Sequence, residues 1–290
     1  MGSNLKPLVV IVGATASGKS KLAMDIAKRF NGEIITADSW TVYKGFDIGT
    51  AKASSNDQKL IRHHLLDLTT ADKGFSAAIF KRLANLAIND ILNRGKLPII
   101  VGGSGLYIDS IIFDYSFLPQ HDKYQRTAMD SLSIEELMGI TLSKGFDTST
   151  IDIRNKRRII RLIENNGKKP SKGVLRSNTL IIGMLIDKQA LIKRIAERLD
   201  NMIISGLEEE VNNLQKTYGW DIEPMKGIGY KEWQAYFNQA QDLQQTKDAI
   251  ISSTKKLVKK QETWFKRNKS IHWINNQRQA VALVTTFLDK

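Results

Sequence analysis

The sequence predicts an α/β protein with a P-loop NTPase-like parallel sheet and helices on both faces, plus a small helical insert domain and a helical C-terminal region. Two observations carry this prediction. Short β-branched runs alternate with stretches of helical periodicity, and the first run leads directly into a glycine-rich loop. The chain has 290 residues, 42% of them hydrophobic, which is enough for a core domain carrying a smaller one.

The strands are predicted from continuous apolar runs, as expected where both faces of a parallel sheet are covered. These runs lie at 8–12, 33–37, 97–101 and 179–186. Between them, 18–30 and 76–93 have the apolar spacing of helices that pack on a sheet. Strand and helix thus alternate through most of the first hundred residues.

The alternation is interrupted after Leu118 by a proline, a polar stretch and a run of basic residues, and it resumes near residue 179. We therefore predict a P-loop core formed by 1–118 and 177–290, with a helical insert domain at 119–176. From Leu191 onward the pattern is helical throughout, and it ends in a helix at about 246–267 that turns its lysines outward.

Positive charge is concentrated in two segments. Residues 154–176 hold nine Lys and Arg against one acid, and 255–269 hold seven against one, so the rest of this +13 protein is nearly neutral. Two basic stripes on a neutral body indicate a surface for a polyanion. The alternative is that they are solvated helix faces.

The chain has no cysteine, and its apolar runs are too short to cross a bilayer. These features exclude thiol chemistry and disulfides, and they favour a cytoplasmic protein without membrane association.

Residues 13–20 fit the phosphate-loop pattern G-x-x-x-x-G-K-[ST]. Loop amides and the N-terminus of the following helix would bind phosphate oxygens, Lys19 would add a charge, and Ser20 would hold Mg²⁺. By its motif the loop also qualifies for ATP. The phosphate-binding positions are Gly13, Ala14, Thr15, Ala16, Ser17, Gly18, Lys19 and Ser20.

The strand that ends in an acid is the one at 33–37, which leads into Asp38. Beside a phosphate loop, Asp38 could be a metal partner or a general base. A helix-capping role is the alternative. The strand at 97–101 instead ends in Gly-Gly-Ser-Gly, which departs from the usual pattern of ATP-dependent phosphate-loop enzymes.

Several segments together resemble the bacterial tRNA dimethylallyltransferase family. They are the phosphate loop, Ile-Ile-Thr-Ala-Asp-Ser at 34–39, Val-Tyr-Lys-Gly-Phe-Asp-Ile-Gly-Thr-Ala-Lys at 42–52, and Val-Gly-Gly-Ser-Gly-Leu-Tyr at 101–107. Arg-Arg-Ile-Ile-Arg at 157–161, Lys-Gly-Ile-Gly-Tyr-Lys at 226–231 and Lys-Gln-Glu-Thr-Trp-Phe at 260–265 are similar as well. The resemblance is collinear over essentially the whole chain.

The resemblance implies transfer of a dimethylallyl group from its diphosphate to N6 of adenosine 37, next to the tRNA anticodon. The products would be N6-isopentenyladenosine and diphosphate. Asp38 would accept the amine proton, Lys19 and Ser104 would complete the catalytic group, Arg198 would grip the diphosphate, and Mg²⁺ would be the cofactor. A surface arginine is the alternative for Arg198.

The same resemblance implies a protein that binds the tRNA anticodon stem-loop and dimethylallyl diphosphate, and that we expect to be a monomer. The tRNA-binding positions would be Asp38, Ser39, Trp40, Thr41, Ser104, Arg126, Arg157, Arg158, Ile159, Ile160, Arg161, Lys226, Gly227, Ile228, Gly229, Tyr230 and Lys231. Trp40 and Tyr43 could stack on the target base or lie in the core. His63 and His64 have no evident third metal ligand, which favours a structural role.

The main rival is a P-loop small-molecule kinase of the nucleotide type, which would share loop and sheet but would not need two basic stripes. A non-catalytic tRNA-binding protein and an enzyme acting on free adenylate are further alternatives. An intact Lys19, Ser20 and Asp38 argues against the first, and the insert with its basic stripe argues against the second.

Overall fold

The computed structural model describes residues 6–118 and 123–289, with side chains described from Arg126 onward in the second range. The chain folds into two compact units, Met1–Ile112 with Arg176–Lys290, and Phe113–Leu175. The insert expected from the sequence began at 119, and residues 119–122 lie outside the described part.

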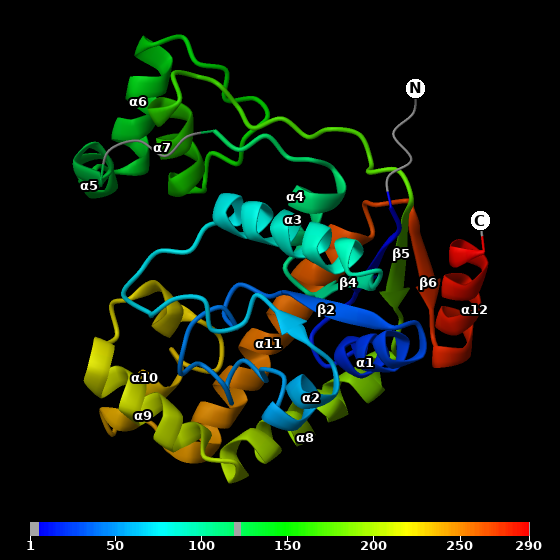
Figure 1. The fold of residues 1–290 in the computed structure, drawn as a ribbon. Helices are drawn as coiled ribbons and strands as arrows, with labels where there is room; N and C mark the ends of the chain where they lie inside the picture. Colours follow the sequence, from blue (N-terminus) through cyan, green and yellow to red (C-terminus); the bar gives the residue numbers. More distant parts are fainter. Residues whose placement is uncertain (1–5, 119–122, 290) are drawn as a thin grey trace. The chain divides into compact units, whose positions relative to one another are not determined.

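The larger unit is built on a six-stranded sheet in the order β3-β2-β4-β1-β5-β6, with every pairing parallel (Figure 1). The α/β prediction is therefore confirmed. The central strand β1 consists of fully buried valine, isoleucine and leucine residues, and its Val10 lies between Ile100 and Ile181 in the register. The strands are β1 Leu8–Val12, β2 Gly32–Ala37, β3 His63–His64, β4 Leu97–Gly102, β5 Thr179–Met184 and β6 Ile271–Ile274.

Helices cover both faces of the sheet. α1 (Lys19–Arg29) and α12 (Gln277–Leu288) share one apolar cluster with the sheet, whereas α3 (Ala77–Asn93) and α4 (Gly105–Ile112) pack together on the other face (Figure 1). The remaining helices of this unit are α2 Ser55–Leu60, α8 Lys188–Ile204, α9 Leu207–Tyr218, the 3₁₀ turn Glu223–Lys226, α10 Trp233–Phe237 and α11 Leu243–Phe265.

The expectation of an entirely helical C-terminal region was wrong at β6. Its sequence, Ile-His-Trp-Ile, is too short for a periodicity signal, and it becomes a strand because β5 offers it a free edge. The apolar stripe after Leu191 is also divided, because Gly206 takes a left-handed backbone (φ 98°) between α8 and α9. The last basic helix, expected at 246–267, is α11.

The smaller unit contains α5 (Lys123–Ser131), α6 (Ile134–Ser143) and α7 (Lys156–Glu164). Leu137 of α6 packs with Ile159, Ile160 and Ile163 of α7 to form its core. α6 begins with a capping box between Ser133 and Glu136, which satisfies two backbone donors at its N-terminus. Among the described residues, no helix is long and apolar enough to cross a membrane.

Candidate active site

The phosphate loop joins β1 to α1 and exposes backbone donors at the helix N-terminus. Ala16 and Gly18 adopt left-handed conformations (φ 61° and 93°), which turn the chain tightly into α1. The amides of Gly18, Lys19 and Ser20 have no acceptor among the described residues. The Ser17 hydroxyl is buried and likewise has no partner there. Unpaired donors around one loop are what an anion such as phosphate would satisfy.

Lys19 and Arg198 add positive charge to this loop. Lys19 Nζ donates to the Ala14 carbonyl at 3.0 Å. Burial, reinforced by the nearby Arg198 guanidinium and opposed by Asp38, lowers the pKa of Lys19 to about 8. Burial likewise lowers the pKa of Arg198, which is therefore not a solvated surface arginine. Two partly desolvated cations beside one loop favour an anionic ligand.

Asp38 follows β2 directly, and one of its oxygens accepts the Trp40 amide at 2.9 Å. This bond forms a local turn rather than a helix cap, because the next helix, α2, begins only at Ser55. The same carboxylate nevertheless lies within electrostatic reach of both Lys19 and Arg198. Asp38 is thus both a turn residue and an ionisable group next to the phosphate loop.

A cavity of about 510 Å³ lies in the larger unit beside the phosphate loop. Thr15, Asp38, Trp40, Ser104 and Arg198 all line it. Further lining comes from Ser39 and from the segment Lys226–Gly229, which the sequence placed among the tRNA contacts. The apolar lining is supplied mainly by α8 and α11 and includes Ile195, Leu199, Met202, Ile250 and Leu257.

Sequence reasoning missed Gln261, which ties α11 to the phosphate loop. Its Oε1 accepts the Thr15 amide at 2.8 Å, and its Nε2 donates to the Gly103 carbonyl at 3.2 Å. One turn later the Trp264 indole donates to Asp109 at 3.2 Å and lies so close to Gly105 that a Cβ there would be 2.4 Å from the ring. The segment 260–265 was noted in the sequence only for its family resemblance. No pattern in the sequence indicated that Gln261 and Trp264 bind residues so far away in the chain.

Several predicted tRNA contacts are buried in the structure, and their assignment to tRNA binding stays a prediction. Thr41 and Tyr230 are in the larger unit's interior, and Ile159 and Ile160 form the core of the smaller one. Apolar residues on the inner face of α7 are required for packing, while Arg157 and Arg158 on the same helix are exposed. Tyr43 is also buried in the core, whereas Trp40 lines the cavity.

The other predicted positions differ in exposure. Lys226 and Lys231 are exposed, and Arg126 is partly buried on α5. Arg161 donates to Glu164 at 3.3 Å and to the Leu118 carbonyl at 3.1 Å, both within the smaller unit. Ser20, the expected Mg²⁺ ligand, is exposed in the first turn of α1 and is not among the residues that line the cavity.

The histidine pair takes part in the sheet, as a structural role requires. His64 Nε2 lies 2.7 Å from Glu33, whose buried carboxylate also accepts bonds from Arg94 and Lys96. The Arg94 guanidinium is the main reason that the pKa of Glu33 lies far below its usual value. Within the described ranges no group of three or more His, Asp or Glu could hold a metal ion.

Residues 41–268 match the sequence model of the IPP transferase family. The chain belongs to this family. The tRNA dimethylallyltransferase of Anoxybacillus flavithermus is 40% identical over 280 residues, covering 92% of this chain and 90% of the relative. The enzyme of that name from Bacillus subtilis is 36% identical over 290 residues, covering 95% and 92%.

Family membership extends to the three-dimensional structure. The crystal structure of the full-length tRNA isopentenylpyrophosphate transferase of Bacillus halodurans superposes with a TM-score of 0.76 at 31% identity. It covers 98% of this chain and 96% of that one. The resemblance stated from the sequence motifs is thereby confirmed, and the family relation favours a transferase over the kinase alternative.

Proposed function

We propose that this chain transfers a dimethylallyl group from dimethylallyl diphosphate to N6 of adenosine 37 in tRNA. The reaction would form N6-isopentenyladenosine next to the anticodon and release diphosphate. The observation that carries the proposal is one cavity that brings a carboxylate, Asp38, beside a phosphate loop in a chain of the IPP transferase family.

The donor diphosphate fits the phosphate loop. The unpaired amides from Gly18 to Ser20, together with Lys19 and Arg198, supply the donors and charge for its oxygens. Negative charge grows on these oxygens as the allylic C1–O bond breaks, so donors already aimed at them stabilise the transition state more than the ground state.

Magnesium fits the same end of the site. An exposed Ser20 hydroxyl and phosphate oxygens are the oxygen donors that Mg²⁺ prefers, and this ion retains several waters. Bound there, it would neutralise diphosphate charge. Ser20 would be its protein ligand.

Asp38 suits the role of proton acceptor. The adenine amine is a weak nucleophile, since its lone pair is delocalised into the ring. As N6 bonds to the allylic carbon, it loses a proton, and the Asp38 carboxylate would accept it while the C1–O electron pair leaves with diphosphate. Ser104, which also lines the cavity, would hydrogen-bond the amine.

The target base must leave its stack to enter a cavity of this kind, and the partly buried Trp40 offers it an aromatic face. The exposed Arg157, Arg158, Lys226 and Lys231 would contact the RNA backbone. The protein would work as a monomer. It would do so in the cytoplasm, where its tRNA substrate occurs.

The test is transfer in nucleotide-free buffer containing tRNA, dimethylallyl diphosphate and Mg²⁺, with diphosphate release followed and the nucleosides analysed by mass spectrometry. One isopentenyl group per diphosphate released supports the proposal. Strict dependence on ATP, or phosphate transfer to a small acceptor, would overturn it in favour of a kinase.

A further inference from the structure

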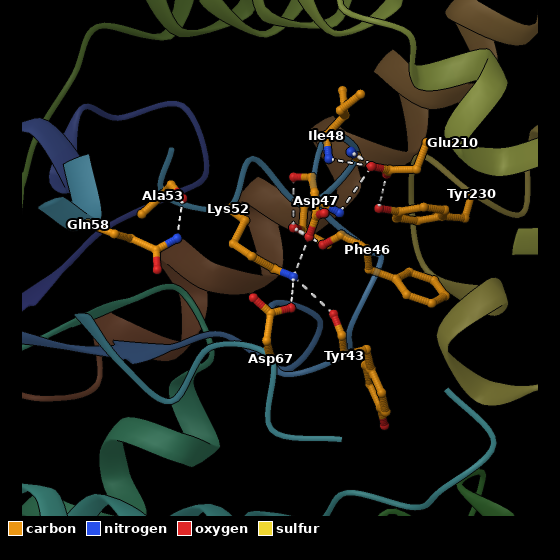
Figure 2. Close-up of polar contacts among 12 residues, drawn as sticks. Tyr43, Phe46, Asp47, Ile48, Lys52, Ala53, Gln58, Asp67, Glu210 and Tyr230 are labelled. Atoms are coloured by element: carbon orange, nitrogen blue, oxygen red, sulfur yellow. Dashed lines mark hydrogen bonds and ion pairs between the residues drawn. The ribbon is translucent and has the colours of Figure 1, made fainter. Parts of the chain in front are cut away.

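A second cluster of polar contacts lies behind the cavity wall, centred on Glu210 in the first turn of α9 (Figure 2). Three consecutive backbone amides donate to its carboxylate. They belong to Asp47 at 3.1 Å, Ile48 at 2.7 Å and Gly49 at 3.0 Å. The Tyr230 hydroxyl donates to the same carboxylate at 2.8 Å. One side chain therefore fastens two segments that are far apart in the sequence.

Both fastened segments form the cavity wall. Gly49 lines the cavity directly, and Tyr230 follows the lining residues Lys226–Gly229. The two segments are in close contact, because a Cβ on Gly49 would lie 2.5 Å from the Tyr230 ring. Lys52 holds the other side of the first segment through Asp47, Asp67 and the Tyr43 carbonyl (Figure 2).

The cavity wall formed by these two segments also contacts Trp40, at the end of the cavity where the reaction would occur. A Cβ on Gly227 would lie 2.4 Å from the Trp40 indole nitrogen, so this segment packs against Trp40, whose amide is bound by Asp38. Among the described residues, the hydrogen-bond partners of Glu210 all lie outside the phosphate loop. In a displacement the amine approaches the allylic carbon on the side away from the leaving diphosphate. With the diphosphate at the phosphate loop, as proposed above, the wall next to Trp40 and Asp38 would be the acceptor side.

We propose that Glu210 is a positioning residue that sets the acceptor side of the cavity for the tRNA base, by clamping 47–49 to Tyr230. This inference rests on the proposed transferase function. Glutamine in its place offers one acceptor oxygen instead of two and adds an N–H group that faces backbone donors, so the three amides and the hydroxyl cannot all be satisfied.

The experiment compares Glu210→Gln with Glu209→Gln, which removes the same charge from an exposed neighbour in the same helix turn. For Glu210→Gln we expect the KM for tRNA to rise about tenfold or more, because partly buried backbone donors lose their acceptor. The KM for dimethylallyl diphosphate should stay within about twofold. Hydrogen exchange at residues 47–49 should accelerate in Glu210→Gln alone.

Tyr230→Phe provides a milder variant, because it removes one of the four bonds and leaves the amides bound. It should raise the KM for tRNA by a smaller factor than Glu210→Gln does. An unchanged KM for tRNA in both variants, or equal increases for both substrates, would overturn the clamp. An inactive parent protein would instead refute the transferase function, and exchange at 47–49 would still test the clamp.

Discussion

Asp38 serves two purposes at the end of β2, and its substitution should separate them. Asn keeps an oxygen for the Trp40 amide, so the turn, the fold and both substrate affinities should persist in Asp38→Asn. The proton acceptor is lost, and single-turnover transfer should slow by about 10²–10⁴-fold. Rates within a few-fold of the parent, measured with both substrates saturating, would show that another group takes the proton.

Lys19 should make donor binding depend on pH. Its pKa of about 8 in the free protein means that the ammonium is present below that pH and is lost as pH rises through it. The affinity for dimethylallyl diphosphate should therefore fall between pH 7 and 9, as measured by calorimetry. Lys19→Arg stays charged and should flatten this dependence, because an arginine is not deprotonated in this range. If the affinity of the parent protein for dimethylallyl diphosphate stayed constant from pH 7 to 9, the role of Lys19 in donor binding would be contradicted.

At the scale of the element, α11 depends on Gln261 for its contact with the phosphate loop. Gln261→Leu removes the acceptor of the Thr15 amide and the donor to Gly103. We expect the KM for dimethylallyl diphosphate to rise about tenfold, since each unpaired polar group costs about 1–3 kcal/mol. Gln244→Leu, on an exposed position of the same helix, is the control and should leave that KM unchanged. Equal effects of the two variants would mean that the contact is dispensable.

Strand β2 depends on the buried carboxylate of Glu33, which is 2% exposed. Glu33→Gln leaves Arg94, Lys96 and His64 without their shared anion and should cost about 3–5 kcal/mol in the free energy of unfolding, measured in urea. Asp90→Asn removes an exposed carboxylate bound to the same arginine and should cost less than about 1 kcal/mol.

Because the pKa of Glu33 is lowered in the folded protein, its contribution to the free energy of unfolding depends on pH. A carboxylate with a depressed folded pKa stabilises the protein fully above its ordinary value of about 4.5, and that contribution is lost as pH falls below it. The stability gap between the parent and Glu33→Gln should therefore narrow on acidification. A gap that is constant between pH 6 and 3 would contradict the ion-pair account.

At the scale of the whole molecule, the basic segments should control RNA affinity. Arg157→Ala with Arg158→Ala removes two exposed charges from α7. It should lower the slope of log affinity for tRNA against log salt concentration by about two. Arg161 is better left intact, because it binds Glu164 and the Leu118 carbonyl. The control variant replaces Lys28 and Lys59, two exposed lysines outside both basic segments. If its salt slope falls by the same amount, the change in slope reflects the net charge of the protein and not a contact made by α7.

Four central strands of the sheet, the phosphate loop and the family could all be predicted from the amino-acid sequence. Buried strands have continuous β-branched runs, and the loop's glycines and Lys19 are needed at fixed spacing, so both leave local signals. Lys19 and Asp38 could be named for the same reason, whereas Arg198 was named only through the family resemblance. Their mutual electrostatic influence then follows from β2 ending beside the loop.

Which residues face the cavity and which lie in the core became clear only from the folded chain. Ile159, Ile160, Thr41 and Tyr230 lie within segments that resemble tRNA-binding motifs, yet they are buried, because a motif contains packing residues as well as contacts. β6 became a strand through its neighbour β5. Gln261 and Glu210 act across separations of more than 150 residues, and hydrogen bonds to distant backbone groups leave no periodic pattern in the chain.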